Sequence, residues 1–299
     1  MDNQKIGMRQ KLAEWLNQYG NGTSDAGNLR RAERLYKLAS TLAPEWSVLW
    51  YNLGLLTKNS GRWEDSLRFN QRALSLNPGD EGACWNLGIA ATALHDWSEA
   101  RRAWKHYGID INEDAGEVMI PAATACVRLN PRSSGEVVWG ERLDPARLVI
   151  LNVPLPESRH RFRDIVLNDG AENGTRAVDG VQVPVFDELA VWRPSEYSTL
   201  RVRLRVPNDE AERQLVQICA ASGIGVEDWS TLRVICAECS RGSPGPHDCK
   251  ARHSEDGTRN FGLAAKDYED AVRTLREWMT ISEGAHFCDL QTAFDARVH

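Results

Sequence analysis

The sequence lacks an uninterrupted apolar run of about 18 residues, the length that a membrane-spanning helix requires. Its opening stretch, MDNQKIGMRQKLAEWL, does not combine a basic start with an apolar core, so we expect no secretory signal peptide. We therefore expect a cytoplasmic protein without a membrane partner. The catalytic signatures H-E-x-x-H, G-x-S-x-G, G-x-x-x-x-G-K-[ST] and G-x-G-x-x-G are missing too, so no common enzyme class is indicated.

A strong charge of either sign is also missing. The 299 residues carry a net charge of −6, and residues 1–130 hold 15 basic and 15 acidic side chains. Without a basic excess, nonspecific binding to nucleic acid is not expected. The seven cysteines are odd in number and too sparse for a disulfide scaffold, so in a cytoplasmic chain they are interpreted as thiols or metal ligands.

What the chain does contain is an internal repeat. The stretch YNLG at Tyr51–Gly54 returns as WNLG at Trp85–Gly88, which gives a period of about 34 residues. The alignment continues beyond these four letters and pairs Trp63 with Trp97. Small residues at Gly54, Gly88, Ser66 and Ala100 would allow paired helices to approach closely, and Pro44 and Pro78 would each end a helix.

This pattern resembles the tetratricopeptide repeat (TPR) family over residues 30–112. The resemblance implies about three helical hairpins stacked as a solenoid, with the first helix of each hairpin facing a bound protein or peptide. The first repeat departs from the pattern, because NGTSDAGN interrupts it. We expect its first helix over Gln4–Tyr19, followed by a long loop.

The resemblance also implies which side chains would contact the partner. They occupy the inner positions of the first helices: Tyr51, Asn52, Leu55, Trp85, Asn86 and Ile89. The two asparagines stand where TPR proteins often hold a peptide backbone. Basic residues that would clamp a C-terminal carboxylate are not evident, so a receptor for the tails of heat-shock chaperones is not expected. In the alternative interpretation, these aromatic side chains pack against the second half of the chain.

After residue 112 the helical period fades and short strand-like runs follow. CVRLNP at 126–131 is either a degenerate fourth repeat or a strand. EVVW, RLVILNV, RDIVLN and VQVPVF, at 136–139, 147–153, 163–168 and 181–186, predict strands. NDGAENGT is interpreted as a turn signal between two of them. Together these runs predict a β-rich subdomain over residues 126–192.

Residues 193–299 predict a small α+β domain of ferredoxin-like type. STLRVRLRV alternates strictly, with Leu200, Val202 and Leu204 on one face. A helix follows, with a cap predicted at Asp209, and then a strand over 230–236 and a second amphipathic helix in AKDYEDAVRTLREWM. Both helices are expected to cover the Leu/Val face.

The opposite face of that strand carries Arg201, Arg203 and Arg205, joined by Arg233 of the next strand. One interpretation is a surface for an acidic partner or a phosphate backbone. The other is a solvated strand face whose arginines pair with nearby carboxylates.

One stretch has the character of a metal site. CAECSRGSPGPHDCKARH supplies Cys236, Cys239, His247 and Cys249, and the C-x-x-C pair followed by a His/Cys pair could complete a zinc tetrahedron. His286 or Cys288 could serve as a ligand instead. In the alternative, all of these cysteines are ordinary thiols.

The sequence thus predicts an α+β protein with a TPR solenoid (1–125), a β-rich subdomain (126–192) and an α+β domain (193–299). We expect a non-catalytic protein-binding protein: an adaptor, a chaperone or a toxin-neutralising immunity protein. The alternative is an enzyme whose active site lies in the C-terminal half, with TPRs that recruit substrate. Carboxylates at Asp164, Asp169, Asp187 and Glu188 would be its candidates for acid–base chemistry.

The cysteine stretch yields a test of its own. If Cys236, Cys239, His247 and Cys249 bind zinc, protein purified without chelator should carry about one metal ion per chain, because structural zinc sites are closed and four-coordinate. Chelation should then expose SRGSPGPHD to protease, since metal binding is coupled to local folding. If elemental analysis finds less than about a tenth of a zinc ion per chain, the zinc site is excluded and these cysteines are ordinary thiols.

Overall fold

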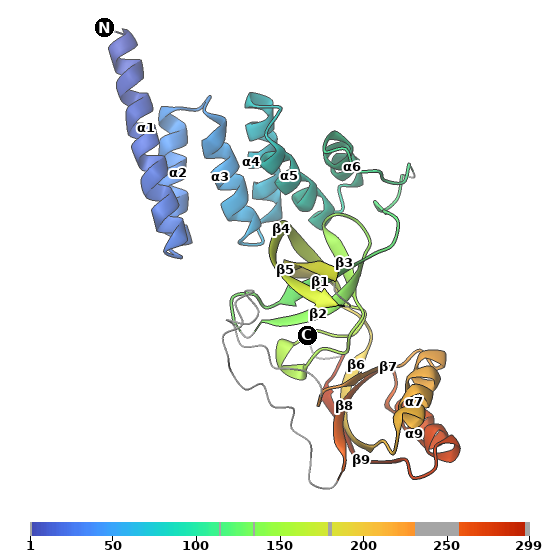
Figure 1. Cartoon of the computed structure of the whole chain (residues 1–299). Coiled ribbons are helices and arrows are strands. Elements are labelled where there is room, and N and C mark those ends of the chain that lie inside the picture. Colours follow the sequence, from blue (N-terminus) through green and yellow to red (C-terminus); the bar gives the residue numbers. More distant parts are fainter. Residues whose placement is uncertain (1, 114, 134, 179–180, 231–256, 297–299) are drawn as a thin grey trace. The chain divides into compact units, whose positions relative to one another are not determined.

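A computed structural model gives the fold of the chain (Figure 1) and describes all residues except 1, 114, 134, 179–180, 231–256 and 297–299. The chain forms two compact units, residues 1–121 with 144–146 and residues 122–143 with 147–299. We call these the helical unit and the sheet unit. The three domain ranges expected from the sequence stay a prediction.

The helical unit consists of three consecutive helical hairpins, α1/α2, α3/α4 and α5/α6. Their helices are α1 (Asp2–Asp25), α2 (Leu29–Leu42), α3 (Ser47–Lys58), α4 (Trp63–Leu76), α5 (Glu81–Ala93) and α6 (Trp97–His106). Pro44 and Pro78 follow the ends of α2 and α4 as predicted. The side chains of Asn28, Asp80 and Asp96 cap α2, α5 and α6 by accepting from the backbone N–H three residues on.

One close contact recurs in each hairpin, between a glycine of the first helix and a large side chain of the second. A Cβ atom added to the glycine would lie far inside van der Waals distance of that side chain. The pairs are Gly20 with Tyr36 (2.6 Å), Gly54 with Asn70 (2.5 Å) and Gly88 with Trp104 (2.5 Å). Both members recur with the period of the sequence repeat, so the repeat in the sequence is a repeat of this contact.

The prediction that the first helix ends at Tyr19 before a long loop is wrong. Helix α1 continues to Asp25, and a short turn with Gly27 at φ 79° leads into α2. Gly20 is needed inside the helix for its contact with Tyr36, whose hydroxyl donates to Asn21 Oδ1 at 2.9 Å. Gly20 also stands one full repeat before Gly54, which is the signal that could have revealed it.

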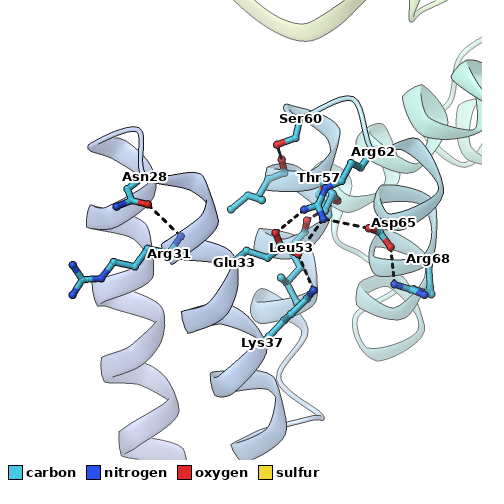
Figure 2. Close-up of polar contacts among 12 residues, drawn as sticks. Asn28, Arg31, Glu33, Lys37, Leu53, Thr57, Ser60, Arg62, Asp65 and Arg68 are labelled. Carbon is cyan, nitrogen blue, oxygen red and sulfur yellow. Dashed lines mark hydrogen bonds and ion pairs between the residues drawn. The ribbon is translucent and has the colours of Figure 1, made fainter.

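Ion pairs connect the second helices of neighbouring repeats (Figure 2). Arg62, just before α4, bonds Glu33 of α2 at 2.8 Å, and Glu33 also pairs with Lys37. Arg62 lies 3.5 Å from Asp65, which in turn pairs with Arg68 at 2.7 Å. Burial raises the pKa of Glu33, but the hydrogen bonds from Arg62 and Lys37 outweigh it, so its pKa lies below the ordinary value.

In the sheet unit, the first five strands form one closed sheet. They are β1 (Ala123–Leu129), β2 (Glu136–Arg142), β3 (Arg147–Ile150), β4 (Ile165–Val178) and β5 (Val181–Arg193), and β1 closes the sheet by pairing in parallel with β5. Its interior is a buried cluster of Val127, Leu129, Val138, Leu148, Ile150 and Val166. Of the two interpretations of CVRLNP, the strand is therefore the right one.

The interpretation of NDGAENGT as a turn between strands is wrong, because residues 168–175 lie within β4. The pairing of β4 with β5 shifts register at Asn168, Glu172 and Thr175. Bulges of this kind accommodate extra residues without ending a strand. The glycines and asparagines that resembled a turn are the residues that tolerate such irregular backbone.

The remaining strands form a separate sheet in the order β7-β8-β6-β9, with every neighbour antiparallel. The elements are β6 (Ser198–Arg205), α7 (Asp209–Ala221), β7 (Gly225–Asp228), β8 (Arg259–Ala265), α9 (Tyr268–Ile281) and β9 (His286–Phe294). Leu200, Val202 and Leu204 pack in one core with residues of α7 and α9, as expected. The strand predicted over 230–236 lies almost wholly outside the described residues.

Two details of the helices differ from the sequence interpretation. The cap of α7 is Asn208, which accepts from Ala211 N, and not Asp209. On α9 the spacing of the sequence predicts an apolar stripe of Tyr268, Val272, Leu275 and Met279. The buried residues are Ala271, Thr274, Leu275 and Trp278, and Tyr268 is 40% exposed. The indole of Trp278 is tolerated inside because its N–H donates to Ala211 O at 2.8 Å.

The glycine contact predicts opposite outcomes for two matched substitutions. Gly88→Ala should destabilise the helical unit by about 1–3 kcal/mol, because overpacking against the buried Trp104 outweighs the better helix propensity of alanine. Gly22→Ala, in α1 with nothing within 4 Å of the new methyl, should stabilise by about 0.5–1 kcal/mol. Thermal unfolding followed by circular dichroism measures both, and equal effects would contradict the contact.

Candidate functional site

In the helical unit, the side chains that the sequence assigned to a partner lie on α3 and α5. Tyr51 and Leu55 of α3 are half-buried and Asn52 lies between them. The Tyr51 ring lies over Gly82 at the start of α5, where an added Cβ would be 3.0 Å from the ring. The aromatic ring is thus held in place by the next repeat.

Beside Tyr51 lies a cluster of three asparagine side chains, which we call the amide cluster. Asn52 Nδ2 donates to Asn17 Oδ1 at 2.8 Å and approaches Asn21 Oδ1 at 3.4 Å. The sequence interpretation missed Asn17 and Asn21. They stand one repeat before Tyr51 and Leu55, so the repeat register alone would have placed them on this face.

The third repeat is arranged differently. The Trp85 indole meets the rings of Trp104 and Tyr107 edge-on, with centroids 5.1 and 4.7 Å away. Asn86 is 4% exposed and Ile89 is 0% exposed. Asn86 and Ile89 therefore offer a partner little or no open surface, whereas Trp85 is half-buried and packed against its own repeat. The candidate face is centred on α1 and α3.

The arginines of β6 have acidic neighbours. Arg201 lies 3.5 Å from Glu157 and Arg203 lies 3.2 Å from Asp289, while Arg205 is exposed. This pairing is what the interpretation as a solvated strand face expects. Exposed pairs of this kind contribute about 0–1 kcal/mol each, so they do not account for the fold.

The predicted zinc ligands Cys236, Cys239, His247 and Cys249, together with Arg233, lie outside the described residues. The alternative ligands His286 and Cys288 lie on β9. Within the described part of the chain, no three His, Cys, Asp or Glu side chains form a group that could hold a metal ion.

The carboxylates considered for acid–base chemistry make internal contacts. Asp187 pairs with the buried Arg128 at 2.6 Å, and Asp164 accepts from the backbone N–H groups of Arg161 and Ser195, both at 2.7 Å. Asp169 accepts from Gly170 N. They hold loops and strands of the sheet unit in place.

Glu188 belongs to a buried polar cluster with His160. His160 Nε2 lies 2.7 Å from Glu188 Oε1, and the two side chains are 5% and 8% exposed. Nδ1 of the same ring donates to Ser158 O at 2.8 Å, and Glu188 Oε2 accepts from Asn130 N at 2.9 Å. Both ring nitrogens of His160 therefore have partners within the sheet unit.

Two groups of this cluster have raised pKa values. Burial raises the pKa of Glu136 to about 7, although Leu155 N donates to its carboxylate. Burial lowers the pKa of His160, but the hydrogen bond and charge of Glu188 outweigh this effect and the pKa lies above its ordinary value. Near neutral pH, folding therefore retains protons that the unfolded chain releases.

Three consecutive hairpins with a glycine contact in the same register form a TPR-like helical region, as the resemblance implied for the N-terminal third. No protein-family model matches the chain, and no curated protein matches it. No helix of the described residues is both long and apolar enough to cross a membrane.

Solved structures similar to the chain include TPR domains. The Arabidopsis OM64 TPR domain has 16% identity and a TM-score of 0.32, over 33% of this chain and 81% of that one. The second TPR domain of Spaghetti (RPAP3), bound to an HSP90 peptide, has 20% identity and a TM-score of 0.32, over 33% and 92%. The Sgt2 TPR domain from Aspergillus fumigatus has 23% identity and a TM-score of 0.30, over 31% and 62%.

The buried cluster predicts how the stability of the sheet unit depends on pH. The folded state binds more protons than the unfolded state between the two pKa values of Glu136, so the free energy of unfolding should fall as pH rises from about 4.5 to about 7. The contribution of His160 is lost in the same direction, as pH rises through its raised pKa. Urea unfolding at several pH values measures this slope.

Glu136→Gln should flatten the slope and stabilise the sheet unit at pH 8 by up to roughly 3 kcal/mol, because no charge is then buried. The matched control is Glu157→Gln, whose side chain is 69% exposed, and it should leave the slope unchanged. A Glu136→Gln variant with the wild-type slope would show that this carboxylate is not desolvated.

Proposed function

We propose that the protein is a non-catalytic binding protein that holds a protein or peptide partner against the face formed by α1 and α3. The amide cluster of Asn17, Asn21 and Asn52 is the observation that supports this most directly. It links the first helices of two neighbouring repeats, beside the half-buried Tyr51 and Leu55.

The chemistry of this face suits a polypeptide. Each asparagine amide both donates and accepts hydrogen bonds, as peptide groups do, so it can bind backbone without reading sequence. Tyr51 and Leu55 add apolar surface for one or two side chains of the partner. Basic residues that would clamp a C-terminal carboxylate are not evident in the sequence, so the proposed ligand is an internal peptide segment.

The biological role that we propose is that of an adaptor, a chaperone or a toxin-neutralising immunity protein in the cytoplasm, without nucleic acid. The second sheet would be a ferredoxin-like module, because its elements within the described residues follow the order β-α-β-β-α-β with strand order β7-β8-β6-β9. Enzyme activity is the weaker candidate, since the carboxylates and the histidine considered for it are bound internally.

The test begins with a pull-down from the source cell and mass spectrometry to identify the partner. Tyr51→Ala combined with Asn52→Ala should then weaken its binding about 5- to 100-fold, because truncating a contact aromatic and a hydrogen-bonding group costs on the order of 1–3 kcal/mol. Isothermal titration calorimetry measures the loss.

Ser75→Ala on α4 is the control, since Ser75 is exposed on a second helix and bonds only locally to Arg72 O. Circular dichroism should show that the double variant is folded. A partner that binds the folded double variant as tightly as wild type would place the site elsewhere.

A further inference from the structure

Helix α1 carries an exposed apolar stripe that the proposed binding face does not use. Met8, Leu12, Trp15 and Tyr19 are 69%, 48%, 58% and 43% exposed, and their spacing places them on one side of the helix. They are four of the twelve exposed large apolar side chains among the described residues. Figure 1 shows α1 at the end of the row of helices, with α2 on one side only.

The repeat register identifies what this stripe corresponds to. Trp15 aligns with Leu49 and Ala83 of the following repeats, and Tyr19 aligns with Leu53 and Leu87. Those four counterparts are at most 1% exposed. In the second and third repeats, therefore, the positions equivalent to Trp15 and Tyr19 are completely covered.

For Leu49 and Leu87, the cover includes the second helix of the preceding repeat. Leu49 packs against Ala39 and Ala43, from α2 and the residue that follows it. Leu87 lies in one cluster with Leu67 and Leu74 of α4. In the later repeats, the positions equivalent to Trp15 and Tyr19 are thus covered by an amphipathic helix that packs alanine or leucine side chains on them. We expect the stripe on α1 to suit a helix of the same kind.

Basic side chains border the stripe. With about 100° of rotation per residue, Arg9 and Lys11 lie on its two sides, whereas Glu14 lies about 130° away from its centre. Both Arg9 and Lys11 are exposed, and neither forms an ion pair with another described residue. At the far end, the Arg31 guanidinium lies 5.1 Å from the Tyr19 ring centroid and donates to its hydroxyl at 2.7 Å.

We propose that this stripe is a second docking site, which takes an acidic amphipathic helix of a partner protein. The helix would pack small and aliphatic residues on Trp15 and Tyr19, as the second helices pack on Leu49 and Leu87. Its flanking carboxylates would pair with Arg9 and Lys11. Such complementarity favours an acidic helix over a basic one of the same shape.

The probe is a stapled, fluorescein-labelled peptide with the sequence of residues 61–78, in which Arg68→Glu and Arg72→Glu make it acidic. Stapling is needed because helices of this length are marginal in water. The comparison peptide keeps both arginines and carries Glu64→Lys and Asp65→Lys. Fluorescence anisotropy with the full chain should show saturable binding of the acidic peptide, at least about tenfold tighter than the basic one.

Leu12→Ser with Trp15→Ser should weaken binding of the acidic peptide by at least about tenfold. Helical circular dichroism should be retained, because both side chains are exposed. Leu38→Ser, equally exposed at 52% but on α2, is the matched control and should leave binding unchanged. Arg9→Glu with Lys11→Glu should reverse the preference between the two peptides.

The proposal is overturned if the acidic peptide does not bind, if the Leu12/Trp15 variant binds it normally, or if the charge variant keeps the wild-type preference. Sedimentation equilibrium provides a further check. A dimer that dissociates on Leu12→Ser with Trp15→Ser would show that a second copy of the chain covers the stripe, and would also overturn the proposal.

Discussion

The helical unit depends on how closely two helix backbones can approach. At Gly20, Gly54 and Gly88 a side chain of the second helix occupies the space where a Cβ atom would be. That space admits a tyrosine ring, an asparagine amide or an indole, so the large partner can vary while the glycine cannot. On the first helices, helical spacing places Tyr51 and the amide cluster on one face, and Trp15 and Tyr19 on another.

The sequence was most informative where a residue pattern has only one structural explanation. The periodic recurrence of Leu-Gly and of proline predicts the hairpins, and strict alternation in STLRVRLRV predicts the buried face of β6. It was least informative where one residue type has two uses. Glycine and asparagine mark turns in most sequences, yet in α1 they sit inside a helix and in β4 inside a bulged strand. Whether such a residue lies in a turn, a helix or a bulged strand depends on the residue that it contacts in the fold, which the local sequence does not show.

The candidate site was predictable in part for the same reason. The register placed Tyr51, Asn52 and Leu55 on the first helices, but a register says nothing about depth, and Asn86 and Ile89 occupy equivalent positions while buried. The amide cluster depends on contacts between residues far apart in the chain, such as Asn52 with Asn17. The zinc ligands predicted around Cys236 lie outside the described residues and stay a prediction.

The ion pairs that join neighbouring second helices affect which repeat of the array unfolds locally most easily. The first repeat contacts one following repeat, through Glu33 and Arg62 on this surface, whereas the second repeat contacts a repeat on each side. In a linear array whose stability is a sum over neighbouring contacts, the end repeat has the smallest opening free energy. Amide hydrogens of α1 and α2 should thus exchange with solvent through local fraying, ahead of those in α3 and α4.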